Sequence, residues 1–446
     1  MPASTTLARA VTLALVALPG AAMAGKLDYT LYTGIEHSNN ISLSTNNPIS
    51  ENVLIPGVDF TYLQQGSTIQ ANVAGTLEYH DYLNGHFDNQ TQTQIAAQAN
   101  WTVLPQRLDF SVEDYAGVQP VDSLASNSPD NQQQTNVLAL GPTLHMHFSD
   151  AMSGQVDLRY INSYASKVDE FNSSRGVAAG RLIRDLNPTD QLSLNVETQR
   201  VVFDQDAGGS DYVRNEAYVR YTSRLAKIDI DALVGGSQLN FDHAPTDSSP
   251  LARVSIGWRP TVRSTFSLDG AYQYADAAQD MMQAPGQSLP SDLEAGNPGP
   301  VGVGNAGSGI GSGNAAINSE VYLEKSLGAS YAYANERLTI TISPLFRKLH
   351  YLNDPTFDQT GRGGGISVGY RLQPTLTLTA FADGERLTYQ SLDRRDKTIR
   401  FGLDLSRQWT SHWSWHASVS RQRRDSNATE QSYRETQVFL SVVYRR

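Results

Sequence analysis

The chain has 446 residues, of which 39% are hydrophobic and 18% charged, with a formal net charge of −11 and no cysteine. The negative charge argues against nucleic acid as a partner, because nucleic-acid-binding surfaces are basic. The lack of cysteine excludes a disulfide framework and a lipid anchor attached to a cysteine after a leader peptide.

The first segment of the chain predicts a cleaved secretory signal peptide over residues 1–24. Arg9 precedes an apolar run over 10–18, and an A-x-A cleavage site lies at 22–24. The run is shorter than the roughly 20 apolar residues that a membrane-spanning helix needs, and no later stretch approaches that length. We therefore expect an exported mature chain that starts at Gly25 and contains no membrane-spanning helix.

From Leu27 onward the sequence repeats one unit: an amphipathic stretch, a short turn, another stretch and a longer polar loop. Within each stretch apolar and polar residues alternate, which places them on opposite faces of a β-strand. The pattern predicts an all-β fold, a single antiparallel transmembrane β-barrel over residues 25–446. We count about twenty strands, with eighteen as the alternative, joined by short periplasmic turns and longer extracellular loops.

The segment over residues 277–318 breaks this rhythm. It is rich in Gly, Pro, Asn and Ser, and it contains Asp280, Asp292 and Glu294 but no basic residue. One interpretation is a surface loop without regular structure, which the composition favours. The other is a loop that folds into the lumen as a constriction or gate, because long loops often carry function.

The last four predicted strands each carry basic residues near their extracellular end, on the same face as their apolar residues. Ten residues separate Leu376 from Arg386 and Trp413 from Arg423. In a tilted strand this spacing rises roughly 25 Å, the height of the apolar band of a barrel. We call this set the basic rim, and it comprises Arg386, Arg395, Lys397, Arg421, Arg423 and Arg434. We predict that the basic rim binds lipopolysaccharide phosphates, since guanidinium groups match phosphate oxygens; a solvated rim without a specific lipid is the alternative.

Aromatic residues occur at the opposite end of the same strands. Amphipathic rings favour the membrane interface, so we expect a structural role at the periplasmic surface. This group comprises Trp409, Trp413, Trp415 and Tyr444.

Motifs for catalysis or cofactor binding are weak. His145 and His147 share a strand face, but a third metal ligand is lacking nearby. His416 lies between Ser414 and Ser418 on the lumenal face, without a nucleophile elbow or an acidic partner that spacing identifies. Nucleotide-binding and hydride-cofactor motifs are not visible in the sequence. We therefore expect no enzyme, no cofactor and no metal site.

The start of the mature sequence, from Tyr29 through GIEHSNNISL (34–43), resembles the PEP-CTERM-system-associated outer-membrane barrels and related porins. In these proteins an aromatic-rich strand runs into an Asn-Asn-hydrophobic turn, and the motifs at 140–142 and 367–371 are similar too. The resemblance covers most of the chain through short motifs. It implies a role as the exit channel of an exopolysaccharide biosynthesis and export system. The chain departs from the usual barrel ending in that Tyr444 is followed by two arginines, so assembly recognition would use an internal signal.

These observations predict an outer-membrane channel of a Gram-negative cell that passes an exopolysaccharide through a polar lumen. Expected partners are outer-membrane lipid and lipopolysaccharide, the transported polysaccharide and periplasmic export components, which would supply the driving force. A diffusion porin for small hydrophilic solutes is the second hypothesis. The third is a barrel enzyme that acts on lipid or polymer through His416.

Overall fold

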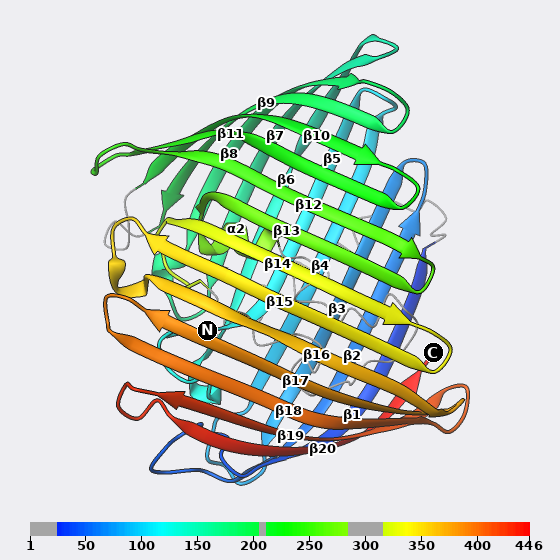
Figure 1. The fold of residues 1–446 in the computed structure, drawn as a ribbon, viewed down its shortest axis with the longest axis vertical. Coiled ribbons are helices and arrows are strands. Elements are labelled where there is room, and N and C mark those ends of the chain that lie inside the picture. Colours follow the sequence, from blue (N-terminus) through cyan, green and yellow to red (C-terminus); the bar gives the residue numbers. More distant parts are fainter. Residues whose placement is uncertain (1–24, 205–210, 284–314) are drawn as a thin grey trace.

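The computed structural model describes residues 25–204, 211–283 and 315–446, and twenty antiparallel strands of this part close into one barrel (Figure 1). The first ten strands are β1 (Lys26–Ser38), β2 (Glu51–Gln65), β3 (Ile69–Tyr82), β4 (Gln90–Leu104), β5 (Leu108–Pro120), β6 (Gln132–Ser149), β7 (Met152–Ala165), β8 (Ser173–Asp185), β9 (Asp190–Phe203) and β10 (Tyr212–Arg224). The other ten are β11 (Ile228–Phe241), β12 (Asp247–Thr261), β13 (Ser264–Ala275), β14 (Tyr322–Ala334), β15 (Leu338–Tyr351), β16 (Gln359–Gln373), β17 (Leu376–Tyr389), β18 (Arg394–Gln408), β19 (Trp413–Ser426) and β20 (Tyr433–Arg445). The described helices are the 3-10 turns η1 (Pro129–Asn131), η2 (Asp169–Phe171) and η3 (Pro355–Phe357) and the α-helix α2 (Ala277–Gln283).

Each strand pairs with its neighbours in sequence order, and β20 pairs with β1 to complete the ring. The closing register runs from Thr30↔Arg445 to Ser38↔Gln437. Closure removes both edge strands of the sheet, so the backbone groups of the first and last strands gain partners. The predicted antiparallel barrel of about twenty strands is confirmed.

Alternate residues of every strand face the lumen or point outward. In β9, Asn195 and Gln199 are buried on the lumenal face, whereas Leu194 and Val196 are 54% and 55% exposed on the outward face. Val234 in β11 is 64% exposed on the same outward face. A contiguous exposed apolar surface around a polar interior is the arrangement of a barrel that lies in lipid.

The two ends of the barrel differ in the length of their connections. At one end the strands are joined by short turns, in which side chains stabilise the backbone: Asn335 Oδ1 accepts hydrogen bonds from the N–H groups of Arg337 (2.9 Å) and Leu338 (2.8 Å). At the other end the connections are longer, as over residues 39–50 and 121–131. We refer to these as the short-turn end and the long-loop end.

Strand spacing requires glycine at certain wall positions. A Cβ on Gly141 of β6 would lie 1.9 Å from the Leu158 carbonyl oxygen, and one on Gly235 of β11 would lie 2.1 Å from the Ala217 carbonyl oxygen. The β6–β7 register also skips Gly141 and Pro142, because proline has no N–H to donate to the ladder.

Among the described residues, no helix has both the length and the apolar character needed to cross a bilayer. Residues 1–24, which the sequence predicts to be a signal peptide, lie outside the described part of the chain.

Candidate functional site: the lumen constriction and the basic rim

The helix α2 lies inside the barrel near the long-loop end. It follows β13 directly, and Figure 1 shows it behind the wall strands β12 to β14. Its residues Ala277 and Ala278 are buried and contact the lumenal side chains of Val137 and Ala139 in β6. The chain therefore turns inward at the end of β13 and narrows the lumen.

Asp276, the residue before α2, attaches the helix to the wall formed by β8 and β10. Its Oδ2 accepts hydrogen bonds from Arg175 Nη1 (2.7 Å) and the Tyr212 hydroxyl (2.8 Å), and its Oδ1 accepts one from the Gln279 N–H (2.9 Å). Burial raises the pKa of Asp276, but the guanidinium groups of Arg175 and Arg214 outweigh it and lower the pKa to about 2. Asp276 is therefore charged at neutral pH and forms a buried ion pair.

A second anchor joins α2 to β14 and β15. Arg347 of β15 donates hydrogen bonds to Asp280 of α2 and, through Nε, to Glu324 Oε1 of β14 (2.9 Å). Gln273 of β13 donates from Nε2 to Glu324 Oε2 (3.0 Å). These bonds hold α2 against a second part of the ring, so β8 and β10 bind the start of the helix and β14 and β15 bind its middle.

An apolar cluster fills the space between the two anchors. It includes Ala315, Ala316 and Ile317, which precede β14 at the end of the long connection. The cluster contains Val137, Ala139, Ile161, Ala165, Phe171, Ala275, Ala277, Ala278, Ala315, Ala316, Ile317, Tyr322, Leu349 and Tyr351. The Ala316 N–H also donates to the Tyr351 hydroxyl (3.0 Å). Apolar burial of this kind stabilises the inward position of both ends of the connection.

The two interpretations of residues 277–318 can be compared with this geometry. Residues 277–283 and 315–318 pack against the inner wall, as the constriction interpretation expects. Residues 284–314, with Asp292 and Glu294, lie outside the described part of the chain.

Charged groups are distributed unevenly around the lumenal wall. On β1, β3 and β20, the carboxylates of Glu36, Glu78 and Glu435 face the lumen, and Glu435 Oε1 accepts from the Ser38 hydroxyl (2.6 Å). We call these three residues the acidic wall. On the opposite side of the ring, β8, β10 and β12 present arginines, among them Arg181. These arginines are balanced by nearby carboxylates, as in the Arg181–Asp157 pair (3.5 Å), whereas none of the ion pairs between described residues joins a lysine or arginine to the acidic wall.

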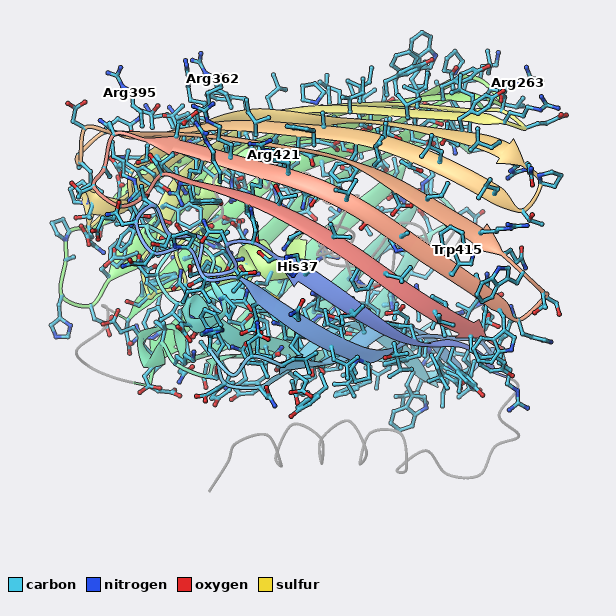
Figure 2. All side chains as sticks on the ribbon, turned by 90° about the horizontal axis from the view of Figure 1, so that it is seen from below. His37, Arg263, Arg362, Arg395, Trp415 and Arg421 are labelled. Carbon is cyan, nitrogen blue, oxygen red and sulfur yellow. The ribbon has the colours of Figure 1, made fainter. Side chains whose placement is uncertain are left out.

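All six residues of the basic rim are exposed on the outward face. Figure 2 shows Arg395 and Arg421 toward the end of the barrel opposite to Arg263, which lies in a short turn. Cross-strand neighbours within the rim carry the same charge: Arg386 pairs with Lys397, and Arg423 with Arg434. Of the six, within the described chain, Arg423 alone forms an ion pair, with Asp425 (2.8 Å).

Register extends this row of cations beyond the residues that the sequence predicted. Arg362 of β16 lies opposite Arg386, and Lys325 of β14 lies opposite Lys348 of β15, all on the outward face. In the sequence these residues appear as lysines and arginines at every second position near a strand end. Only the cross-strand register shows that they form one row. Like charges that face each other are unfavourable unless an anion lies between them.

The aromatic group lies near the short-turn end. Trp409 and Trp413 are exposed, and the Trp413 ring packs on Tyr444 with 5.1 Å between centroids. Trp415 shares the outward face of β19 and lies on the side of the barrel away from Arg395 in Figure 2. This placement is compatible with the expected interfacial role.

His416 has an acidic partner that sequence spacing did not identify. Its Nε2 is hydrogen-bonded to Asp404 of the neighbouring strand β18, and Ser441 of β20 is its direct cross-strand neighbour. His416 Nδ1 and Ser441 Oγ have no hydrogen-bond partner, but the residues are only 4% and 1% exposed. A substrate in the lumen does not reach these atoms, so the group is a wall contact.

The other histidine pair does not form a metal site in the described chain. His145 Nε2 lies 3.0 Å from Asp109 Oδ2, and His147 is exposed at the end of β6. Groups of three or more potential ligands are not found among the residues that the structure describes.

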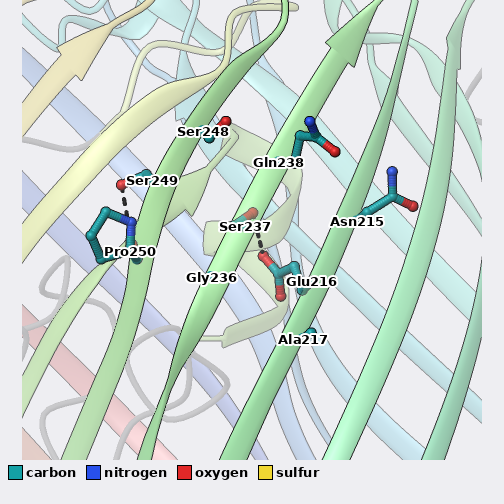
Figure 3. Close-up of a pocket in the computed structure, with 9 residues that line it drawn as sticks. All are labelled: Asn215, Glu216, Ala217, Gly236, Ser237, Gln238, Ser248, Ser249 and Pro250. Atoms are coloured by element: carbon teal, nitrogen blue, oxygen red, sulfur yellow. Dashed lines mark hydrogen bonds between the residues drawn. The ribbon is translucent and has the colours of Figure 1, made fainter.

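A shallow hollow of about 520 Å³ lies on β10, β11 and β12 near the long-loop end (Figure 3). Small residues, Ala217 and Gly236, form part of it, together with polar Asn215 and Gln238. The hollow is open. It forms because the outward side chains of these strands are small, and it is not an enclosed ligand cavity.

Comparison with known proteins identifies a related family for the last part of the chain. Residues 362–446 match the family model described as "Putative beta-barrel porin 2". No curated protein matches the chain. Similar solved structures include the ferric enterobactin receptor PfeA of Pseudomonas aeruginosa (10% identity, TM-score 0.45, covering 94% of this chain and 80% of that one), the FrpB iron transporter of Neisseria meningitidis (8%, 0.43, 94% and 82%) and the siderophore receptor PirA of Acinetobacter baumannii (9%, 0.45, 94% and 80%). The family match and the closed twenty-stranded sheet together support a porin-like β-barrel of the outer-membrane type.

Proposed function

We propose that this protein is an outer-membrane channel that passes an exopolysaccharide from the periplasm to the cell surface. The observation that carries the proposal is the combination of a polar lumen, an outward apolar band and an inward segment that narrows the lumen at one end. A channel of this width needs a constriction if it is to pass a polymer without leaking small solutes freely.

The lumenal side chains suit a hydrated sugar polymer. Lumenal side chains that are not buried, among them Tyr218 of β10 and Gln98 of β4, line the wall together with carboxylates. Tyrosine rings offer apolar faces to sugar rings, and the neighbouring polar groups hydrogen-bond to hydroxyls. The driving force would come from polymer synthesis and periplasmic export components, since passage through the channel is passive.

The test is a comparison of surface and secreted polysaccharide in a strain that lacks this chain, the parent strain and a complemented strain. Loss of polysaccharide that complementation restores supports export. Unchanged polysaccharide would overturn the proposal and favour the second candidate, a diffusion porin for small hydrophilic solutes. The family match of residues 362–446 supports that candidate, which predicts steady conductance without any partner.

Within this proposal the basic rim binds the phosphates of lipopolysaccharide in the outer leaflet. The support is the like-charged cross-strand pairs Arg386–Lys397 and Arg423–Arg434, for which phosphates would supply the missing counter-charge. Replacing all six rim residues by glutamine should reduce the lipopolysaccharide that co-purifies with the barrel. Equal co-purification would support a solvated rim. Glutamine at Arg445 and Arg446, which lie at the short-turn end, is the matched control.

The proposal assigns no enzymatic role. The His416–Asp404 pair is the strongest basis for a barrel enzyme, and its burial argues against one. Hydrolysis of lipid or polymer by the purified barrel that His416→Ala abolishes would contradict this assignment.

A further inference from the structure

The wall of the barrel separates between β4 and β5 at the long-loop end. Their register runs from Leu104↔Leu108 to Ile95↔Ala116 and then stops, although the two strands continue to Gln90 and Pro120. On their other sides both strands stay paired: β4 with β3 up to Gln90, and β5 with β6 up to Pro120. We call the separated residues, 90–94 and 117–120, the β4–β5 seam.

Glutamine side chains replace the missing backbone ladder across the seam. Gln134 of β6 donates from Nε2 to the carbonyls of Thr93 (2.7 Å) and Gly117 (3.0 Å), and its Oε1 accepts from the Thr93 N–H (3.1 Å). Gln92 of β4 donates from Nε2 to Gln132 Oε1 (2.8 Å), two strands away. A seam held by side-chain amides separates by rotamer changes, without breaking a backbone ladder.

The outward surface beside the seam is polar where the apolar band is expected. Asp114 of β5 and Asn136 of β6 both point outward, and Asn136 Nδ2 donates to Asp114 Oδ1 (2.6 Å). Asn162 of β7 lies on the same face, opposite Leu138. A carboxylate at a lipid-facing position is costly unless polar groups approach it. Polar lipid headgroups that enter the seam would place polar groups next to the Asp114 carboxylate.

A second separation, between β12 and β13, has a different cause. That register ends at Ala252↔Tyr272, next to Pro250, which has no N–H, and at the point where β13 turns inward to α2. In the β4–β5 seam, by contrast, the one proline is Pro120 at the end of β5, four residues beyond the last paired residue Ala116, and neither strand is joined directly to a helix.

We propose that the β4–β5 seam is a lateral portal, through which the polar headgroup of an outer-leaflet amphiphile passes between the lumen and the membrane while its acyl chains stay in lipid. Gln134 holds the portal closed, and the Asp114–Asn136 pair lines its membrane side. This route is separate from the axial passage proposed above and depends only on the placement of the barrel in a membrane.

The test uses site-specific photo-crosslinking in outer membranes that contain lipopolysaccharide. A benzoylphenylalanine at Gln94, on the lumenal face of the seam, should capture lipopolysaccharide. The matched control is the same residue at Gln422, also a lumenal glutamine four positions from the long-loop end of its strand, where both neighbouring ladders are complete. Capture at Gln94 that clearly exceeds capture at Gln422 supports the portal. No capture at Gln94, or equal capture at both positions, overturns it.

Two further variants test the mechanism of closure. Gln134→Ala should raise the crosslinking yield at Gln94 several-fold and speed hydrogen exchange in residues 90–94. A disulfide between Thr93→Cys and Val118→Cys, which a continued register would place opposite each other, should abolish capture. The chain has no other cysteine to interfere. Unchanged yields in both variants, with a heat-modifiable barrel on gels, would contradict the portal and leave the polysaccharide-export test unaffected.

Discussion

Asp276→Asn should release the lumen constriction and raise the conductance of the barrel. The wild-type carboxylate is 3% exposed and accepts hydrogen bonds from Arg175, Tyr212 and the Gln279 N–H. The substitution removes the charge and leaves the Arg175 guanidinium buried without its counter-ion. Breaking one partner of a buried ion pair costs about 3–5 kcal/mol, which moves the equilibrium between anchored and released α2 by roughly two to three and a half orders of magnitude.

The assay is single-channel recording in a planar lipid bilayer at neutral pH. The matched control is Asp231→Asn, which breaks a more exposed lumenal ion pair with Arg220, and such pairs contribute at most about 1 kcal/mol. We expect a larger or noisier conductance for Asp276→Asn and little change for the control. Traces of the two variants that match the wild type would refute the assignment of Asp276 as the anchor.

The same anchor predicts a pH dependence. The pKa of Asp276 lies at about 2 in the folded protein, below its ordinary value of 3.8, because Arg175 and Arg214 outweigh the effect of burial. The stabilisation is therefore complete above the ordinary pKa and is lost as the pH falls through about 2. The anchor should therefore hold between pH 7 and pH 5, so the rise in conductance that follows its release should appear only in strong acid, and the Asp276→Asn variant should lack this rise.

Three other predictions concern the wall. Neutralising the acidic wall with glutamine should lower the permeability of cations relative to anions, because it removes lumenal carboxylates that no lysine or arginine of the described chain pairs with; unchanged reversal potentials in a salt gradient would refute this. Gly235→Ala should destabilise the barrel by about 1–3 kcal/mol through contact with the neighbouring strand, whereas Gly176→Ala, which meets nothing within 4 Å, should not; the temperature of the heat-induced gel shift distinguishes the two. Asp404→Asn should cost about 1–3 kcal/mol in the same gel assay and leave polysaccharide output unchanged, since the contact with His416 is structural; loss of output at full stability would contradict that role.

The sequence alone determined the type of fold and the faces of the strands. Alternation of apolar and polar residues is a local property with a period of two, so the outward position of Arg386 and the lumenal position of His416 follow from their neighbours in the chain. Turn residues such as those around Asn335 also determined where strands end, because their hydrogen bonds are to residues nearby in the chain. The number of strands followed from counting these units.

Only the tertiary structure decided which distant residues meet. The ion pair of Arg175 and Asp276 joins residues 101 positions apart, and Asp404 meets His416 diagonally across the β18–β19 ladder. Such contacts depend on strand register and ring closure, which local periodicity does not encode. The inward position of α2 and the β4–β5 seam arise in the same way, since each depends on the partners that the closed ring brings to a segment.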